Sequence, residues 1–246
     1  MTVPPIALEV PAAVRTLAAG RAATPVWSNE IGGTTWRFDG DPVTYLKIGP
    51  PHPEVEFAAE TARLAWVGQY VPAPRVAGTG EINGLLWLET EALPGFGAVS
   101  GHFSPGGAGY RPPAEVATAL GRALRQLHEA LPAASCPWTW SIADSLALAS
   151  TETREQFTPA PDLDLVVCHG DACNPNFLLD DDLACTGYVD LGHLGVADRW
   201  ADIAPATMSL VWDFGDGLTD AFLEGYGIAL DERKLAFYGR LWDADL

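Results

Sequence analysis

The pattern of hydrophobic and polar positions divides the chain into a β-rich first part and a helical second part. Residues 26–50 contain two runs rich in β-branched and aromatic side chains, separated by a turn signal at residues 39–42. Within residues 43–48, successive side chains alternate between two faces, as in a strand. Residues 84–92 form another apolar run, which ends at a proline- and glycine-rich connection at residues 94–97. The first part of the chain is therefore predicted to be a small sheet.

One helix is predicted within this sheet region, at residues 54–69. Its apolar side chains recur at helical spacing on one face: Phe57, Leu64 and Val67. Glu60 lies three residues after the first of these and four before the second, so its carboxylate shares the inward face. A buried carboxylate needs a cationic or hydrogen-bonding partner. Lys47, on the preceding predicted strand, is the expected partner.

The second part of the chain begins with a loop and continues mainly as helix. Residues 100–113 are rich in glycine and proline and predict a loop. Residues 114–130 predict an amphipathic helix, because apolar side chains recur at intervals of three and four residues: Val116, Leu120, Leu124 and Leu127. Two short strands are expected at residues 165–168 and 186–189. These patterns together predict an α+β protein with two lobes.

The charge balance narrows the class of partner. The chain of 246 residues carries 32 acidic and 14 basic side chains, a formal net charge of −18. This excess of negative charge argues against a nucleic acid or an anionic membrane surface, because either would be repelled. It fits a cationic partner, although an acidic proteome, as in halophiles or actinomycetes, gives the same balance.

Targeting and cysteine signals point to a cytoplasmic protein. The N-terminal segment has neither a basic region nor an unbroken apolar core, and no stretch approaches the roughly 18 apolar residues that span a bilayer. The cysteines show no CxxC spacing and are expected to be reduced: Cys136, Cys168, Cys173 and Cys185. Together with His169, they match the spacing of no common zinc site.

Residues 165–204 hold the densest set of chemically capable side chains. A β-branched strand end leads into an HGD sequence that ends at Asp171, and Asn176 follows five residues later. A turn at residues 180–182 then returns the chain to Asp190, so a hairpin would bring these three side chains to one end. Carboxylate and amide oxygens are the ligands that Mg²⁺ takes when phosphate oxygens complete its shell. An aspartate that is not a ligand could take a proton from an attacking hydroxyl group.

Other polar and aromatic residues have a structural interpretation. His128 lies beside an apolar helix face and is expected to be a buried, hydrogen-bonding histidine. Asp198 and Asp202 are expected to brace the loop that carries Asp171 through backbone hydrogen bonds rather than to react. Most tryptophans are expected in the core, but three could instead flank a sugar: Trp138, Trp140 and Trp200.

The order and spacing of these motifs resemble the aminoglycoside phosphotransferases, which are antibiotic-resistance kinases with a protein-kinase-like fold. The resemblance rests on the HGD sequence with Asn176 after it, on the DLG sequence that begins at Asp190, and on the GVADRWADIA sequence of residues 195–204. It extends over most of the chain through Lys47 in TYLKIG, Glu60, the VPAPRV sequence and the C-terminal segment. The GVADRWADIA continuation and the C-terminal segment resemble enzymes that act on a 3'- or 3''-hydroxyl group.

The resemblance implies a bilobal fold, with a nucleotide-binding lobe at residues 1–92 and a catalytic, substrate-binding lobe at residues 93–246. The phosphoryl donor would be ATP, with GTP as the alternative. Lys47 would hold the α- and β-phosphates, oriented by an ion pair with Glu60. The backbone of residues 90–92 would hydrogen-bond adenine, with Thr90 and Ala92 at its ends. Small and hydroxyl residues would lie at the phosphates: Gly32, Gly33, Thr34 and Thr35.

The resemblance also implies roles in the second lobe. Asp171 would accept or orient the proton of the substrate hydroxyl, and Asn176 and Asp190 would hold Mg²⁺. Acidic side chains would attract the ammonium groups of an aminoglycoside, and the end of the chain would line the pocket. The candidate substrate-binding residues are Glu152, Glu155, Asp198, Asp243, Asp245 and Leu246. A monomer is expected.

The sequence departs from the family pattern in several places. Residues 31–35 do not form the GxGxxG loop of protein kinases. His193 stands where relatives often carry arginine, and Met208 stands where many 3'-type enzymes carry arginine. Residues 140–162, where the family builds substrate-binding helices, form a short stretch. The difference at Met208 favours a streptomycin-like substrate modified at its 3''-hydroxyl.

Two other functions remain open from the sequence. One is a kinase that acts on another hydroxyl-bearing antibiotic or metabolite, and the other is a non-catalytic nucleotide-binding protein. The complete set of Lys47, Glu60, Asp171, Asn176 and Asp190 argues against the second, since a protein without activity has no chemical need for all five. The chain leaves no room after Asp190 for the activation segment of a protein kinase.

Overall fold

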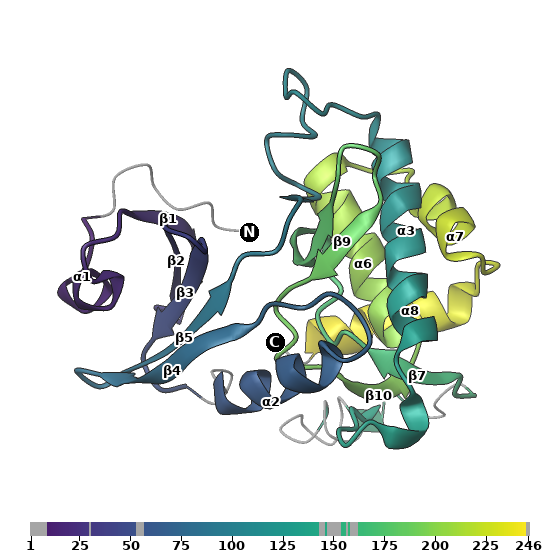
Figure 1. Ribbon diagram of the computed structural model, residues 1–246. Helices are drawn as coiled ribbons and strands as arrows, with labels where there is room; N and C mark the ends of the chain where they lie inside the picture. Colours follow the sequence, from purple (N-terminus) through teal and green to yellow (C-terminus); the bar gives the residue numbers. More distant parts are fainter. Residues whose placement is uncertain are drawn as a thin grey trace. The chain divides into compact units, whose positions relative to one another are not determined.

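The chain divides into two compact units, each with its own core (Figure 1). The computed structural model describes residues 9–29, 31–52, 57–142, 146, 154–155, 157 and 162–244. Residue 244 is described by its backbone alone. The first unit comprises Met1–Gln69 and Ala73–Leu93, and the second comprises Tyr70–Pro72 and Pro94–Leu246. The chain therefore changes unit one residue after the boundary expected between residues 92 and 93.

The first unit is an antiparallel sheet with two accompanying helices among its described residues. Its strands follow the spatial order β1-β2-β3-β5-β4. Its elements are α1 (Ala12–Ala18), β1 (Ala23–Ser28), β2 (Thr34–Phe38), β3 (Thr44–Gly49), α2 (Phe57–Val67), β4 (Val76–Ile82) and β5 (Leu85–Glu91). The expected strands at residues 43–48 and 84–92 and the expected helix are therefore present.

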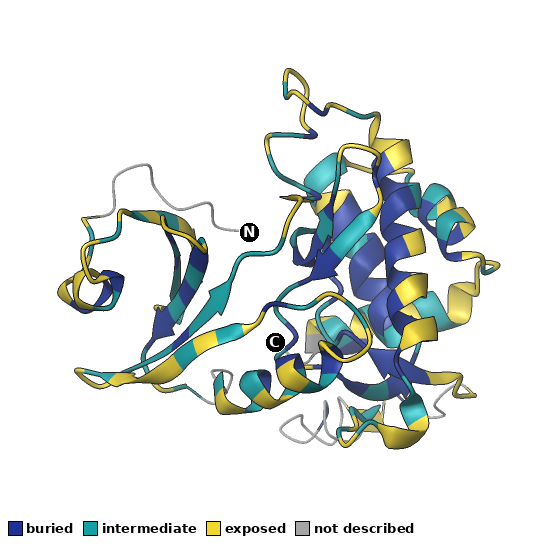
Figure 2. Ribbon diagram, in the orientation of Figure 1, coloured by how far each residue is buried: buried dark blue, intermediate teal, exposed yellow. Residues whose placement is uncertain are grey.

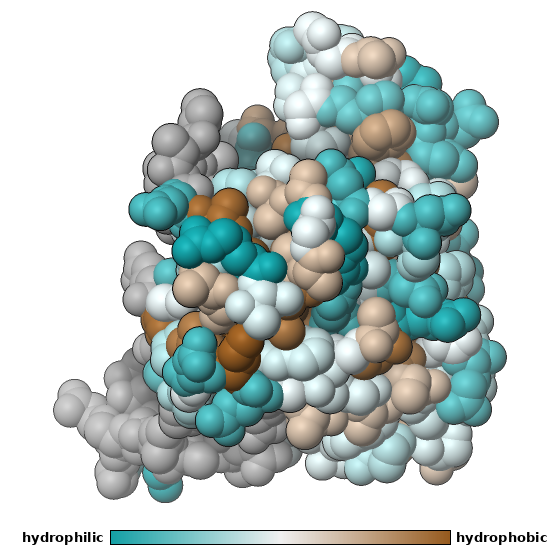
Figure 3. All heavy atoms as spheres, turned by 60° about the vertical axis from the view of Figure 1, so that its left-hand side comes forward, coloured by the Kyte–Doolittle hydropathy of each residue, from teal (hydrophilic) through white to brown (hydrophobic). Residues whose placement is uncertain are grey.

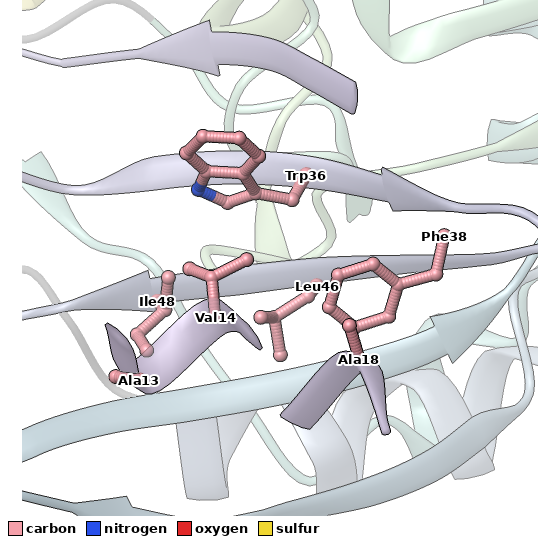
Figure 4. Close-up of a cluster of buried hydrophobic side chains, with 7 residues drawn as sticks. All are labelled: Ala13, Val14, Ala18, Trp36, Phe38, Leu46 and Ile48. Atoms are coloured by element: carbon pink, nitrogen blue, oxygen red, sulfur yellow. The ribbon is translucent and has the colours of Figure 1, made fainter. Parts of the chain in front are cut away.

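Helix α1 covers one face of this sheet. Its buried side chains meet those of β2 and β3 in a hydrophobic cluster (Figure 4), which consists of Ala13, Val14, Ala18, Trp36, Phe38, Leu46 and Ile48. Arg21 connects the end of α1 to the sheet, because its guanidinium donates to Glu89 Oε1 at 2.6 Å and to Thr44 Oγ1 at 3.0 Å. The sequence pattern did not predict α1, since a run of seven residues is too short to show helical periodicity.

The alternation of β3 assigns its side chains to opposite faces. Thr44, Leu46 and Ile48 are buried on the face that α1 covers. Lys47 therefore lies on the other face. Helix α2 contributes Glu60 to that same side, as one of its buried residues.

The second unit is mainly helical and also contains short strands. Its elements are β6 (Phe96–Gly97), α3 (Pro113–Ala130), η1 (Ala133–Ser135), β7 (Leu165–Cys168), η2 (Asn174–Asn176), β8 (Phe177–Leu179), β9 (Cys185–Tyr188), β10 (Gly195–Asp198), α6 (Trp200–Phe214), α7 (Thr219–Tyr226) and α8 (Glu232–Ala244). Strand β7 pairs with β10, and β6, β8 and β9 form a separate small sheet. The expected α+β composition, with a β-rich first part and a helical second part, is confirmed.

Helix α6 lies at the centre of the helical packing. Figure 2 shows it buried over most of its length, and its first eleven residues are almost all buried. Helices α3 and α7 approach each other through two glycines. A Cβ atom on Gly121 would lie 2.0 Å from the Phe222 carbonyl oxygen, and one on Gly225 would lie 2.0 Å from the Thr118 carbonyl oxygen. Only glycine permits this close approach.

The surface is mixed in polarity. On the face shown in Figure 3, hydrophobic side chains form small separate patches among hydrophilic ones. Such scattered exposure is ordinary for a folded protein. Among the described residues, every helix is too short or too polar to cross a membrane.

Candidate active site

A tight turn after β7 carries the HGD sequence. His169 is fully buried, and its Nε2 lies 3.0 Å from the Val189 carbonyl oxygen. The backbone N–H of Asp171 donates to His169 Nδ1 at 3.3 Å. These two partners fix the tautomer, because Nε2 must donate to the carbonyl and Nδ1 must accept. His169 therefore ties the turn to the strand that precedes Asp190.

Gly170 is required in this turn by its geometry. Its φ of 83° lies in the left-handed region, and a Cβ atom there would be 2.2 Å from the His193 carbonyl oxygen. The two loops that carry Asp171 and Asp190 therefore touch through backbone atoms at Gly170.

Asp202, which lies at the start of α6, holds the HGD turn in place through hydrogen bonds. Its Oδ2 accepts hydrogen bonds from the His169 N–H at 2.6 Å and from His128 Nε2 at 2.9 Å, and its Oδ1 accepts from the Gly170 N–H at 3.0 Å. Burial alone would raise the pKa of Asp202, but the hydrogen bonds from His128 and from the His169 backbone contribute to lowering it below its ordinary value. The predicted roles of His128 as a buried hydrogen-bonding residue and of Asp202 as a brace are confirmed.

His128, Cys168 and Asp202 also place one potential metal ligand each within 4.8 Å of one another. Burial, and after it the charge of Asp202, raises the pKa of the Cys168 thiol well above its ordinary value. Zinc binds a thiolate, whereas this thiol is held protonated and donates to the Asp198 carbonyl oxygen at 3.3 Å. With Asp202 already accepting three hydrogen bonds, the cluster is a hydrogen-bond network and not a metal centre.

Asp171 and Asn176 are joined directly. The side-chain amide of Asn176 donates to the Asp171 carboxylate at 3.0 Å and to the Asp171 carbonyl oxygen at 2.9 Å. Because both hydrogens of the amide group are used in this way, the Asn176 Oδ1 oxygen points to a different side and is an acceptor. Asp171 is thus held as a candidate general base, and Asn176 Oδ1 is left as a candidate metal ligand.

Asp190 is brought to the same end by a hairpin, as the sequence predicted. Strands β8 and β9 pair antiparallel, and the Val189 N–H donates to the Asn176 carbonyl oxygen at 3.0 Å. Asp190 follows directly, with a φ of 60°. This left-handed conformation is uncommon outside glycine, and aspartate is among the residues that tolerate it best. The chain therefore turns away from the strand at Asp190, the residue expected to hold a metal ion.

Cys173 lies within the loop between Asp171 and Asn176. Burial, and after it the Asp171 carboxylate, raises the pKa of its thiol. The thiol is therefore neutral at physiological pH and is not an activated nucleophile.

The first unit contributes the expected ion pair. Lys47 Nζ lies 2.7 Å from Glu60 Oε1, and the two side chains are 27% and 7% exposed. Partial burial keeps this pair less screened than a surface pair. The loop before β2 is also ordered by a side chain, since the Gly33 N–H donates to Asn29 Oδ1 at 2.5 Å. Gly32 and Gly33 lie in this loop, and Thr34 and Thr35 begin β2.

Two of the backbone N–H groups expected near adenine are used within the first unit, whereas the contact of the carbonyl groups of residues 90–92 with adenine stays a prediction. The Ala92 N–H donates to the Val43 carbonyl oxygen at 2.9 Å, and the Glu91 N–H donates to the Arg75 carbonyl oxygen at 2.8 Å. Thr90 lies within β5, paired with Tyr45 and Val76. The sheet therefore already uses the N–H groups of residues 91 and 92, and neither is available to a purine in this structure.

The substrate-binding candidates are distributed differently from the expectation. Asp198 is a correction: its side chain is fully buried, accepts from Lys234 Nζ at 2.8 Å and from the Asp164 and Trp200 N–H groups, and has no surface for a substrate. Glu155 and Asp243 are exposed. Glu152, Asp245 and Leu246 lie outside the described residues. Of the tryptophans considered for sugar stacking, Trp200 is buried, whereas Trp138 and Trp140 are half-buried.

Sequence reasoning missed two residues that hold the loop after Asp171 through hydrogen bonds to Asn174. Asn174 is bound by Ser209 and Asp213, which both lie on α6. A signal was present, because Asp202, Ser209 and Asp213 recur at helical spacing on one face of α6. The spacing of polar residues carries this information as well as the spacing of apolar ones does.

Comparison with known proteins identifies the family of the chain. Residues 24–158 and 146–238 match the "Phosphotransferase enzyme family". The chain is 36% identical to an aminoglycoside 3'-phosphotransferase of Streptomyces fradiae, over 80% of this chain and 84% of the relative. It is 33% identical to a streptomycin 3''-kinase of Streptomyces griseus, over 87% and 88% of the two chains.

Solved structures agree with these sequence matches. A crystal structure of an aminoglycoside-3'-phosphotransferase of type VIII superposes with a TM-score of 0.73 at 30% identity, and covers 95% of this chain and 98% of that one. The aminoglycoside phosphotransferase of Streptomyces rimosus in complex with ADP and streptomycin gives a TM-score of 0.67 at 26% identity, over 95% and 96% of the chains. The chain belongs to the phosphotransferase enzyme family.

Proposed function

We propose that the protein transfers the γ-phosphoryl group of ATP to a 3'- or 3''-hydroxyl group of an aminoglycoside antibiotic and so confers resistance. The observation that carries this proposal is the Asp171–Asn176 pair, joined by hydrogen bonds at the end of the hairpin where Asp190 follows strand β9. The relatives that align over most of the chain and are named for aminoglycoside substrates support the choice of acceptor.

Asp171 is the proposed catalytic base. Its carboxylate accepts from Asn176, which orients it, and its own N–H is held by His169, so the side chain cannot rotate freely. A carboxylate held in this way can accept or orient the proton of the attacking hydroxyl group. Catalysis then rests mainly on positioning and on neutralising charge at the transferred phosphoryl group.

The residues present fit a magnesium ion, which the family implies. Asn176 Oδ1 and the Asp190 carboxylate are hard oxygen donors at one end of the hairpin, and hard oxygen is the ligand type that Mg²⁺ takes. We propose that these two residues hold the ion, which when bound neutralises charge on the phosphate oxygens. Asp171 is left to the hydroxyl group, since the Asn176 amide already occupies its Oδ2 atom.

In the first unit, Lys47 is the proposed ligand of the nucleotide phosphates. The Glu60 carboxylate, almost fully buried, holds its ammonium group at 2.7 Å. The loop of Gly32, Gly33, Thr34 and Thr35 is the proposed phosphate loop. Its small and hydroxyl side chains would let the backbone approach the phosphate oxygens closely. ATP is the proposed donor, with GTP as the alternative.

The proposed acceptor matches the charge of the chain. Aminoglycosides carry several ammonium groups, and the formal net charge of −18 attracts them while it disfavours nucleic acid and anionic membrane surfaces. Glu155 and Asp243 are exposed and remain proposed substrate contacts, together with Glu152, Asp245 and Leu246. The absence of an arginine at Met208 favours a streptomycin-like acceptor. We further propose a cytoplasmic monomer.

A coupled ADP-release assay tests the proposal. The protein is given ATP, Mg²⁺ and, in turn, streptomycin, kanamycin, neomycin and a cyclic peptide antibiotic, and product is identified by mass spectrometry. We expect release with one aminoglycoside subclass and a loss of at least about a hundredfold in kcat for Asp171→Asn, because the base is removed while its shape is kept. Release with the cyclic peptide alone, or equal turnover by Asp171→Asn, would contradict the proposal.

A further inference from the structure

Helix α6 presents a polar stripe to the catalytic loop. Asp202, Ser209 and Asp213 are separated by seven and four residues. At about 3.6 residues per turn, they lie within about 40° of one another around the helix axis. Asp202 holds the first half of the loop, through the N–H groups of His169 and Gly170. Ser209 and Asp213 lie about two and about three turns further along, next to the second half.

Those two residues hold Asn174 at two points. The Asn174 N–H donates to Ser209 Oγ at 3.0 Å, and the Asn174 side-chain amide donates to Asp213 Oδ2 at 2.9 Å. The Ser209 hydroxyl in turn donates to the same Asp213 oxygen at 3.2 Å. Asn174 and Ser209 are 1% and 0% exposed, so water competes little for these bonds.

The contacts continue from Asn174 to the proposed catalytic residue. Asn174 begins the single 3₁₀ turn η2, which the hydrogen bond from the Asn176 N–H to the Cys173 carbonyl oxygen closes at 3.0 Å. Asn176, at the end of that turn, donates to the Asp171 carboxylate. A displacement of Asn174 therefore moves Asn176, and with it the carboxylate that Asn176 orients.

We propose that Asp213 is a positioning residue for phosphoryl transfer, acting through Asn174 and Ser209 to fix the second half of the catalytic loop. This inference rests on the proposed function, because Asp171 and Asn176 are the groups that Asp213 positions. The Asp213 carboxylate collects two donors on one oxygen, and its removal leaves both buried partners unsatisfied. Asp202 and Asp213 together clamp the loop at both ends against one rigid helix.

Steady-state kinetics give the first readout. In Asp213→Ala, we expect kcat to fall about tenfold or more, with the KM values for ATP and the aminoglycoside unchanged within about twofold, because alignment is lost and binding is kept. Asp213→Asn retains an acceptor oxygen and is expected to recover most of kcat. In Asn174→Ala, the further change Asp213→Ala should cost less than it does in the wild type, since the direct side-chain contact is already gone and only the route through Ser209 remains.

Hydrogen–deuterium exchange of the free protein gives a readout that needs no substrate. In Asp213→Ala, the amides of residues 174 and 176 should exchange at least about tenfold faster, while those of residues 169 and 170, which Asp202 holds, should keep their protection. Asp220→Ala is the matched control, because it removes an equal charge from an exposed position and should change neither readout.

The outcomes separate this inference from the proposed function. Unchanged loop exchange in Asp213→Ala would overturn the inference, and so would a rise in the aminoglycoside KM alone, which would make Asp213 a substrate contact. Failure of the wild-type protein to phosphorylate any aminoglycoside would overturn the proposed function instead, while loop exchange would still decide whether Asp213 braces the loop. If Asp213→Ala does not fold, Asn174→Ala, which removes the same contact from the other side, is compared with Asp213→Asn, which keeps an acceptor.

Discussion

Asp202 shows how much one side chain can hold in place. It has no exposed surface, and it accepts hydrogen bonds from His128 on α3 and from two backbone groups of the HGD turn. His128 Nδ1 lies 2.8 Å from the Tyr226 hydroxyl oxygen, which adds α7 to the same network. The catalytic turn is therefore fixed by three helices through one carboxylate.

Replacing this carboxylate should cost stability in a pH-dependent way. In Asp202→Asn, one acceptor oxygen is replaced by an NH₂ group that faces other hydrogen-bond donors. We therefore expect the free energy of unfolding, measured in urea at pH 7, to fall by about 3 kcal/mol. The pKa of Asp202 is lowered in the folded state from an ordinary value of 3.8. Its charged form therefore stabilises the fold above that value, and the stabilisation is lost as the pH falls through the folded pKa.

The gap in unfolding free energy between wild type and Asp202→Asn should therefore narrow as the pH is lowered below about 4. Asp182→Asn, at an exposed position, is the control and should follow the wild type throughout. A gap that stays constant from pH 7 to pH 3 would show that the Asp202 charge contributes nothing to stability.

Residue pairs were predictable where one pattern contained both partners. Glu60 shares an apolar helix face, and Lys47 is the one cation on the preceding strand, so their ion pair followed from the sequence. The ion pair of Asp198 with Lys234 did not follow from the sequence, because Lys234 lies 36 residues further along, in α8. No local pattern indicates that this lysine reaches back to bury the carboxylate.

At the scale of elements, close helix contact sets the position of the side chains just described. Gly121 and Gly225 let α3 and α7 pack backbone to backbone, and the same two helices supply His128 and Tyr226. A change of their separation would pull the Tyr226 hydroxyl away from the His128 ring. The close contact of α3 and α7 at Gly121 and Gly225 therefore acts on the HGD turn through the hydrogen bonds of His128 and Tyr226.

Gly121→Ala should strongly destabilise the second unit. The added methyl group would lie 2.0 Å from the Phe222 carbonyl oxygen, so the helices must separate, at a cost of about 2 kcal/mol or more. The matched control is Gly239→Ala in α8, whose methyl group would lie 3.6 Å from the Met208 sulfur. Because alanine is the better helix former, that control should be neutral or stabilising by about 0.5 kcal/mol or more in thermal unfolding. Equal changes in stability for Gly121→Ala and Gly239→Ala would contradict a tight contact between α3 and α7 at Gly121.

Elements were predictable in proportion to their length and regularity. The helix expected at residues 114–130 is present as α3, and the strand expected at residues 165–168 is present as β7. Strand β10, however, contains buried glycine, alanine and aspartate, and resembles a loop in sequence. It becomes a strand because it pairs with β7, a long-range contact that no local propensity encodes.

At the scale of the whole molecule, charge separates the two proposed substrates. The net charge of −18 attracts a polycationic aminoglycoside and repels an anionic nucleotide. Lys47 and the phosphate loop must bind ATP against this field by local contacts, whereas the aminoglycoside is drawn by many carboxylates at once. Salt should therefore weaken the binding of the aminoglycoside and should not weaken that of ATP, because it screens exposed charges beyond about 10 Å at 0.1 M.

Raising the salt from about 20 mM to about 300 mM should increase the aminoglycoside KM several-fold and leave kcat nearly unchanged, since encounter is weakened and alignment is not. The KM for ATP, measured in the same assay with Mg²⁺ in excess, should stay constant or fall, and it serves as the internal control. An aminoglycoside KM that does not respond to salt would mean that short-range contacts alone recognise the substrate. The acidity of the chain would then reflect an acidic proteome and not its acceptor.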